Sequence, residues 1–140
     1  MTNFSTFLFE HWILSSAFVV ILSALLVCEL SASKESSDIT TEKAIDLINH
    51  SNAVVLDVRT ETEYKAHHII NAVNVPLNNI TTANKKLAKY NKKNVIIVCS
   101  KSTPKSQVIK KLKEVGINSV FNLTNGMQAW DKDNLPTVKS

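Results

Sequence analysis

The chain has 140 residues, which leaves room for one domain of about 100 residues with a modest core once the amino terminus is set aside. Its 16 basic and 12 acidic residues give a mild net charge of +4, and the lysines are spread along the chain without interleaved aromatic residues, so we expect no nucleic-acid partner. The two cysteines, Cys28 and Cys99, lie in segments of different character, which argues against a disulfide framework.

The first predicted element is an apolar helix over residues 12–28, which carry no charge. At 1.5 Å per residue this helix would be roughly 26 Å long, close to the thickness of a bilayer's hydrocarbon core. A cleaved signal peptide is the alternative, but no Lys or Arg precedes His11. We therefore expect residues 1–30 to form a retained transmembrane anchor. Because lysines begin only at Lys34, the positive-inside rule places the following domain in the cytoplasm.

A small, charged segment over residues 31–38 predicts a tether to a folded domain over residues 39–138. Thr40 or Thr41 would cap a short amphipathic helix at the start of this domain. Residues 53–58 then form an apolar run, which is typical of a strand buried on both faces.

Further elements follow at short intervals. Thr60 and Glu63 form the capping box of a helix of one to two turns. We expect a short strand over residues 72–75, a lysine-rich surface helix over 79–90, buried strands over 95–98 and 119–123, and a helical turn over 127–130. This alternation of strands and helices predicts an α/β fold with a parallel sheet.

Cys99 stands out because it follows the strand over residues 95–98 and precedes a helix with apolar positions at Val108 and Leu112. Backbone N–H groups and the helix dipole at such a place would stabilise a thiolate, so Cys99 is a candidate nucleophile. The alternative is a small apolar residue that merely ends a core strand. Sites in parallel sheets lie at the carboxyl ends of the strands, where Asp57 and Arg59 are also expected.

Several spaced motifs between Asp38 and Pro136 resemble a single rhodanese domain. They are Leu56-Asp57-Val58-Arg59, Tyr64 with His68-Ile69, Val75-Pro76-Leu77, residues 95–99, Gly116-Ile117, and Gly126 with Trp130. With its amino-terminal span, the chain is similar to the small membrane-anchored rhodanese-like proteins of the YibN type, found in bacterial inner membranes. The resemblance implies a five-stranded parallel sheet with helices on both faces, and a persulfide carried on Cys99.

The implied activity is sulfur transfer without a cofactor. The donor would be thiosulfate or a protein persulfide, and the acceptor a thiol. The residues implied to bind the donor form one loop: Ser100, Lys101, Ser102, Thr103 and Lys105. Lys101 and Lys105 are the cations available to a sulfonate group, although each is equally well explained as a solvated surface lysine.

The loop departs from the family's pattern at two positions. The family usually places a glycine where Ser102 stands and an arginine where Pro104 stands. Serine is strained at positive φ, and proline has no N–H to offer an anion. Pro104 instead suits the first position of the following helix, with Thr103 as its cap. We therefore expect weak activity or an altered donor preference.

Alternative functions stay open. The missing glycine and arginine favour a non-catalytic module that binds a membrane protein through the carboxyl edge of the sheet. The spacing between Cys99 and Lys105 also resembles that of cysteine phosphatases, but lysine does not reproduce the bidentate grip of arginine on an oxyanion.

The remaining polar residues have simpler structural interpretations. Asp57 and Arg59 would support the site, most simply as an ion pair that fixes the loop after their strand. His68 is expected to be buried and hydrogen-bonded, and His67 and His68 are adjacent and point apart. We find no spacing typical of metal ligands and expect no metal site.

Overall fold

The structure is a computed structural model that describes residues 11–31 and 37–140. The chain divides into two compact units, Met1–Ser33 and Lys34–Ser140. The described part of the first unit is the helix α2 (Trp12–Ser31), found where a helix was predicted.

Helix α2 presents apolar side chains in every direction. Consecutive residues such as Phe18, Val19 and Val20 are each more than 60% exposed, and consecutive positions point about 100° apart around a helix. Within residues 11–31 and 37–140, however, no helix combines the length and the apolar character needed to cross a membrane. The anchor over residues 1–30 stays a prediction, and its first ten residues lie outside the described part.

The second unit is built on a five-stranded sheet in the order β1-β6-β5-β2-β4, and all of its pairings are parallel. Its strands are β1 (Ser37–Ile39), β2 (Val54–Asp57), β4 (Val73–Asn74), β5 (Val95–Val98) and β6 (Val120–Leu123). All four residues of the central strand β5 are buried, as the apolar run predicted. The expected α/β fold with a parallel five-stranded sheet is confirmed.

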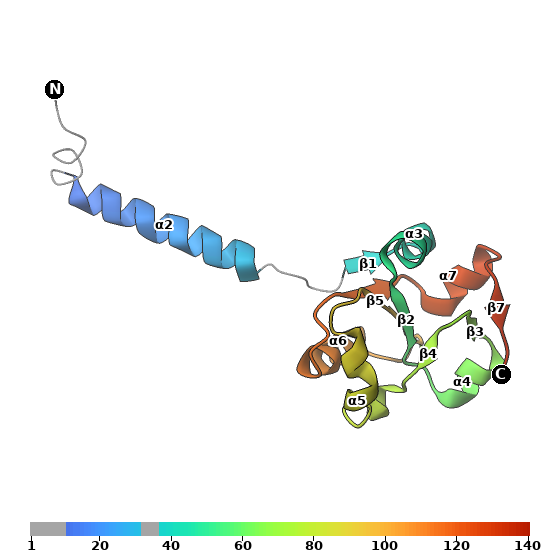
Figure 1. Ribbon diagram of the computed structural model, residues 1–140. Helices are drawn as coiled ribbons and strands as arrows, with labels where there is room; N and C mark the ends of the chain where they lie inside the picture. The colour runs from blue at the N-terminus through green and yellow to red at the C-terminus, as the bar shows by residue number, and fades with distance from the viewer. Residues whose placement is uncertain (1–10, 32–36) are drawn as a thin grey trace. The chain divides into compact units, whose positions relative to one another are not determined.

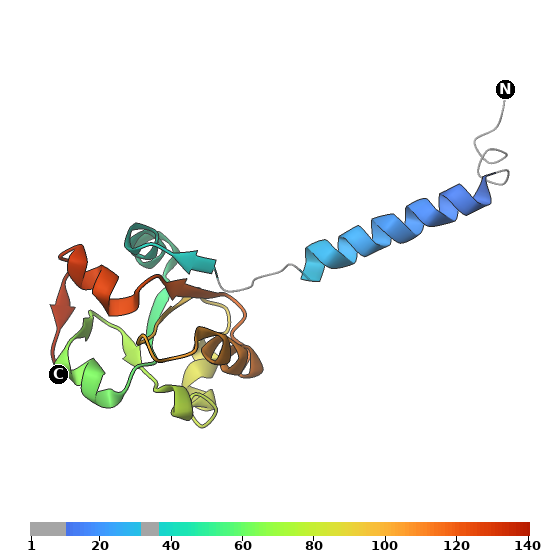
Figure 2. The same ribbon diagram turned by 180° about the vertical axis from the view of Figure 1, so that it is seen from behind.

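Helices cover both faces of this sheet (Figures 1 and 2). On one face lie α3 (Thr41–Ser51) and α7 (Gly126–Lys132), and on the other α5 (Asn84–Leu87), the 3₁₀ helix η2 (Ala88–Tyr90) and α6 (Lys105–Glu114). Alternate strand residues point to opposite faces, so Ile96 packs in the core beneath α3 and α7, whereas Ile97 packs beneath α5 and α6.

Shorter elements complete the domain. They are α4 (Glu61–Ala66), the 3₁₀ helix η1 (Leu77–Asn79), and the antiparallel pair β3 (His68–Ile69) and β7 (Thr137–Val138). The capping box predicted for α4 is confirmed, because the Thr60 hydroxyl accepts from the Glu63 N–H and the Glu63 side chain accepts from the Thr60 N–H. Thr40 likewise caps α3, as predicted.

The single surface helix predicted over residues 79–90 is wrong. The structure replaces it with η1, a turn, the four-residue α5 and η2. Three β-branched residues, Ile80, Thr81 and Thr82, follow Asn79, and the Thr82 hydroxyl donates to the Asn79 carbonyl at 3.0 Å. Such local bonds compete with helical ones, so lysines on the surface are not enough to maintain a continuous helix here.

Candidate functional site

Cys99 directly follows β5, between the ends of β2 and β6 at the carboxyl edge of the sheet. Its side chain is half-buried and opens on a pocket of about 230 Å³. The other residues lining this pocket are Ser100, Lys101, Thr103, Lys105, Asn122, Leu123, Asn125, Gly126 and Gln128. The pocket therefore brings together Cys99 and four of the five loop residues predicted to bind a donor. The fifth, Ser102, lies next to it in the loop and is exposed.

The loop after Cys99 is held by its own hydroxyl groups. The Ser100 Oγ lies 2.7 Å from the Thr103 Oγ1 and 3.2 Å from the Ser102 Oγ. The Thr103 N–H also donates to the Ser100 carbonyl at 3.1 Å. The prediction that Thr103 caps α6 with Pro104 as first helical residue is wrong: Pro104 itself occupies the N-cap position, without a side-chain cap. Thr103 is engaged with Ser100 instead.

Backbone donors in this loop remain available to a ligand. In the described part of the chain, the N–H groups of Lys101 and Ser102 have no acceptor. Neighbouring N–H groups of this kind can bind an anion. The loop thus has donors for a sulfonate even though Pro104 contributes none.

Lys105 reaches across the pocket to an acidic partner that sequence reasoning did not connect with the site. Its Nζ lies 2.7 Å and 2.9 Å from the two carboxylate oxygens of Asp38 in β1. The Asn122 side-chain amide donates to the same carboxylate at 2.8 Å. These hydrogen bonds, from Lys105 and then Asn122, lower the pKa of Asp38. Lys101, by contrast, is exposed and has no carboxylate partner among the described residues.

The ionisation of Cys99 differs from the sequence-based expectation of a stabilised thiolate. Burial, and then the negative charge of Asp57, raises the pKa of the Cys99 thiol to about 11, against a smaller lowering by Lys105. Desolvation disfavours the charged form of a thiol. The uncomplexed protein therefore holds Cys99 as a neutral thiol at neutral pH.

Asp57 and Arg59 form a buried ion pair beneath the site. Asp57 is fully buried and Arg59 is 5% exposed, and the Arg59 Nη2 lies 2.6 Å from the Asp57 Oδ2. The Arg59 Nε adds a bond of 3.0 Å to the Oδ1, and its Nη2 also donates to the His67 carbonyl at 2.8 Å. Neither residue lines the Cys99 pocket, so both support the loop after β2 rather than contact a substrate.

His68 is buried and hydrogen-bonded, as expected. Its Nδ1 lies 2.8 Å from the Tyr64 carbonyl oxygen, and its ring stacks on that of Tyr64 at 3.7 Å between centroids. His67 points elsewhere, with its Nε2 3.1 Å from Asp131. Across residues 11–31 and 37–140, no three His, Cys, Asp or Glu side chains gather as ligands for a metal ion.

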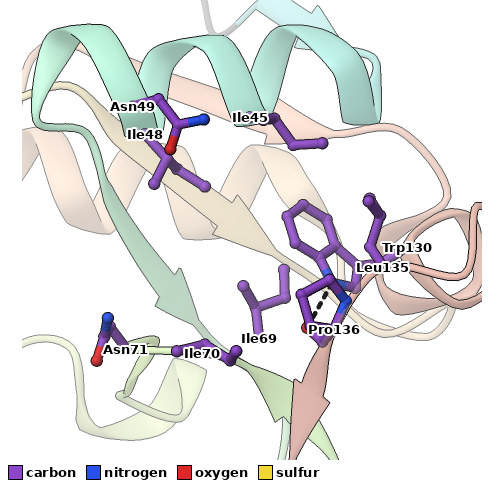
Figure 3. A pocket seen from close by; sticks show the side chains of 9 residues that line it. All are labelled: Ile45, Ile48, Asn49, Ile69, Ile70, Asn71, Trp130, Leu135 and Pro136. Atoms are coloured by element: carbon purple, nitrogen blue, oxygen red, sulfur yellow. Dashed lines mark hydrogen bonds between the residues drawn. The ribbon is translucent and has the colours of Figure 1, made fainter.

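A second, apolar pocket of about 320 Å³ lies between α3, α7 and the segment after β3. Figure 3 shows Ile45 and Ile48 of α3 facing Ile69, Ile70 and Trp130 across it. The Trp130 Nε1–H donates a hydrogen bond to the Pro136 carbonyl oxygen at 3.1 Å, so the polar atom of the indole has a partner within the wall of this pocket. No residue is shared with the Cys99 pocket, so the two hollows are separate sites.

Comparisons with known proteins agree with this geometry. The family of rhodanese-like domains matches residues 40–133. An uncharacterized protein of Buchnera aphidicola (Schizaphis graminum) is 38% identical over 104 residues, which cover 74% of this chain and 71% of that protein. The uncharacterized protein YibN of Escherichia coli K12 is 32% identical over 141 residues and 99% of each chain. The expected similarity to YibN is thus confirmed.

Two further similarities concern a named enzyme and a solved structure. The thiosulfate sulfurtransferase GlpE of Coxiella burnetii is 28% identical over 88 residues, which cover 63% of this chain and 80% of that enzyme. The crystal structure of a rhodanese-related protein from Thermoplasma volcanium superposes with a TM-score of 0.63 at 23% identity, covering 74% of this chain and 99% of that one. The latter similarity establishes the fold.

Proposed function

The chain belongs to the family of rhodanese-like domains, and from this we propose that it carries sulfane sulfur as a persulfide on Cys99 and passes it to a thiol acceptor. The observation that carries the proposal is the position of Cys99 at the end of the central strand, open to a pocket that also contains Lys101 and Lys105. Similarity to a thiosulfate sulfurtransferase supports thiosulfate as one donor. A protein persulfide is the second donor that we propose.

The reaction consists of two displacements. The Cys99 thiol first loses its proton to solvent, and the thiolate attacks the outer sulfur of thiosulfate. The sulfur–sulfur bond of thiosulfate breaks, and sulfite leaves with its electron pair. The thiolate of the acceptor then attacks the outer sulfur of the Cys99 persulfide, and Cys99 leaves as a thiolate that regains a proton.

Residues of the loop would bind the anionic part of the donor. The free N–H groups of Lys101 and Ser102 are donors for sulfonate oxygens, and the Lys101 ammonium supplies an unpaired positive charge beside the pocket. Lys105 is already paired with Asp38. Its contribution is therefore to the electrostatics of Cys99 rather than to a direct grip on the donor.

A second candidate function is a non-catalytic rhodanese-like module that binds a membrane protein. The observation in its favour is the burial of Cys99 near Asp57, which raises the pKa of the thiol to about 11 and leaves little thiolate at neutral pH. Sulfur loading separates the two candidates, because a binding module would keep Cys99 as an unmodified thiol.

We also propose that residues 1–30 hold the domain at a bacterial inner membrane, with the domain in the cytoplasm. An apolar helix without a polar side, such as α2, is stable in an apolar environment. The test is fractionation of the full chain from bacterial cells, followed by carbonate extraction and intact-mass measurement. Full-length protein in the extracted membrane pellet is expected; soluble protein, or a chain shortened near Ala32, would contradict the anchor.

The decisive experiment for sulfur transfer is the intact mass of the full chain in detergent after incubation with thiosulfate, beside the Cys99→Ser variant. We expect one added sulfur atom, removed by a thiol reductant and absent from the variant. A folded protein that gains no sulfur, even when offered a protein persulfide, would contradict the proposed carrier.

A further inference from the structure

The lysines of the chain are concentrated in one segment. Ten of the 15 lysines lie from Lys85 to Lys113, and Glu114 is the single acidic residue between Glu63 and Asp131. A lysine-rich composition alone would spread these residues and their acidic counterparts over the whole domain. The segment therefore has a positive charge that its own sequence does not balance.

The fold gathers most of this charge on one side of the sheet. Seven of the lysines are exposed on α5, η2, the turn that follows them, and α6, and we call this set the basic face: Lys85, Lys86, Lys89, Lys92, Lys93, Lys110 and Lys113. Helices α5 and α6 lie side by side over the same core (Figures 1 and 2). The Lys111 Nζ donates to the Leu77 carbonyl at 3.2 Å.

Three lysines elsewhere in the domain are neutralised by a carboxylate, although Lys101, Lys132 and Lys139 are not paired among the described residues. Lys43, Lys65 and Lys105 each form an ion pair with a carboxylate, at 2.7 to 2.8 Å. No lysine of the basic face is paired with a carboxylate in the part of the chain that the structure describes. The basic face thus has a local excess of positive charge, which favours an anionic partner.

The basic face extends to the edge of the sheet opposite Cys99. The turn that carries Lys92 and Lys93 leads directly into β5, so it lies at the amino edge of the parallel strands. The end of α6 is beside this turn, because a Cβ on Gly116 would lie 3.2 Å from the Asn91 Nδ2. The chain also joins the sheet at this edge, where β1 begins at Ser37.

We propose that the basic face binds the anionic phospholipid surface of a membrane, so that the amino edge of the domain is next to the lipid and the Cys99 pocket is directed away from it. The proposal is independent of sulfur transfer, and it adds a surface contact to the proposed anchor. In this arrangement the pocket stays open to acceptors in solution while the domain is held at the membrane.

The chemistry of the basic face favours lipid over nucleic acid. It has no arginine, and Tyr90, the aromatic residue within it, is 8% exposed. Nucleic-acid sites usually combine arginine with aromatic side chains that stack on bases. Lysine carries a compact, hydrated charge that suits diffuse attraction to a layer of anionic headgroups. Helix α2 of the same chain adds exposed apolar surface, which also favours a lipid partner.

The test is lysine acetylation of the full chain associated with phosphatidylcholine vesicles, with or without phosphatidylglycerol, read by mass spectrometry. With phosphatidylglycerol we expect acetylation of Lys89, Lys92 and Lys113 to fall at least about threefold, and the protection to disappear in high salt. Lys43 and Lys132, which lie outside the basic face, should react equally in both vesicles.

Two variants with matched charge sharpen the test. The first variant removes four charges from the basic face through Lys89→Gln, Lys92→Gln, Lys93→Gln and Lys113→Gln. The second variant removes four charges from the rest of the domain through Lys43→Gln, Lys65→Gln, Lys132→Gln and Lys139→Gln. Each lysine near an anionic surface raises partitioning onto that surface by about fivefold, in addition to any contribution of the anchor. Only the first variant should therefore lose its preference for phosphatidylglycerol, by at least about tenfold.

Several results would overturn the proposal. One is equal acetylation of the basic-face lysines in the two kinds of vesicle, and another is failure of the chain to associate with either kind. A third is stronger protection of these lysines from acetylation by a short DNA duplex or RNA than by phosphatidylglycerol. Sulfur loading of Cys99 is measured on the same variants. Unchanged loading in the first variant, with lost lipid preference, would show that lipid binding and sulfur transfer are separate properties.

Discussion

The carbonyl oxygen of Cys99 lies against Gly126, at a distance of 2.5 Å from the position that a Cβ on this glycine would occupy. Gly126 is the first residue of α7 and has a φ of +51°, next to Asn125 with a φ of +58°. The start of α7 is thus pressed against the backbone of the candidate nucleophile. A side chain at residue 126 is excluded by space and by backbone conformation together.

We expect Gly126→Ala to displace the Cys99 loop and to destabilise the domain by about 1–3 kcal/mol, because the new methyl group would overlap the Cys99 carbonyl oxygen and force the backbone to shift. Denaturant unfolding measures the stability, and the alkylation rate of Cys99 reports the displacement. Gly116→Ala is the control: its φ is +92°, but it lies at the opposite edge of the sheet. It should lose stability without a change in Cys99 alkylation relative to the wild type; equal effects of both variants on Cys99 would contradict the prediction.

The reactivity of Cys99 should depend steeply on pH. Since burial and Asp57 raise its pKa to about 11, the thiolate fraction rises about tenfold for each pH unit between pH 7 and pH 10. The rate of alkylation by iodoacetamide should follow the same slope in the uncomplexed protein. A rate that reaches its plateau near neutral pH would mean that the loop stabilises the thiolate after all.

Lys105 and Lys101 should differ in their influence on Cys99. The charge of Lys105 lowers the pKa of Cys99, so Lys105→Gln should raise this pKa further and slow alkylation at pH 9 by about twofold to fivefold. Lys101→Gln should leave alkylation nearly unchanged and instead weaken the loading of sulfur from thiosulfate, because its ammonium is unpaired beside the pocket. Faster alkylation of the Lys105 variant would refute the role assigned to this lysine.

Arg59 should be needed for stability more than for chemistry. Arg59→Ala leaves the fully buried Asp57 carboxylate without its partner, and removal of one member of a buried pair typically costs about 3–5 kcal/mol. Arg59→Lys keeps the charge but loses the two-pronged contact with Asp57, so an intermediate loss is expected. Urea unfolding ranks the three proteins; a stable Arg59→Ala domain would contradict the structural role.

The fold was predictable where its signals are local. The apolar run of β5 and the threonine caps of α3 and α4 each depend on a few neighbouring residues, and each lies in the structure where the sequence placed it. By contrast, β1 has three residues and a mostly polar sequence, Ser37-Asp38-Ile39, and it becomes a strand only by pairing with β6. Such a strand has no periodic pattern of its own.

The candidate site was predictable in composition but not in electrostatics. The position of Cys99 at the end of β5 follows from the sequence, and the donor-binding role of its loop stays a prediction. The partner of Lys105, however, is Asp38, which is 67 residues away along the chain. The pKa of Cys99 likewise depends on its burial and on the charge of Asp57, which belongs to the neighbouring strand. These properties arise from tertiary packing and leave no trace in local spacing.

The bond between Asp38 and Lys105 has a mechanical consequence. Asp38 belongs to an edge strand whose neighbour in the sheet is β6, directly after the segment that joins the two units of the chain. A pull on that segment would act first on β1, and detaching β1 would separate Asp38 from Lys105 and free a positive charge next to Cys99. We therefore expect the ionisation of the Cys99 thiol to respond to tension at the point where the domain is attached.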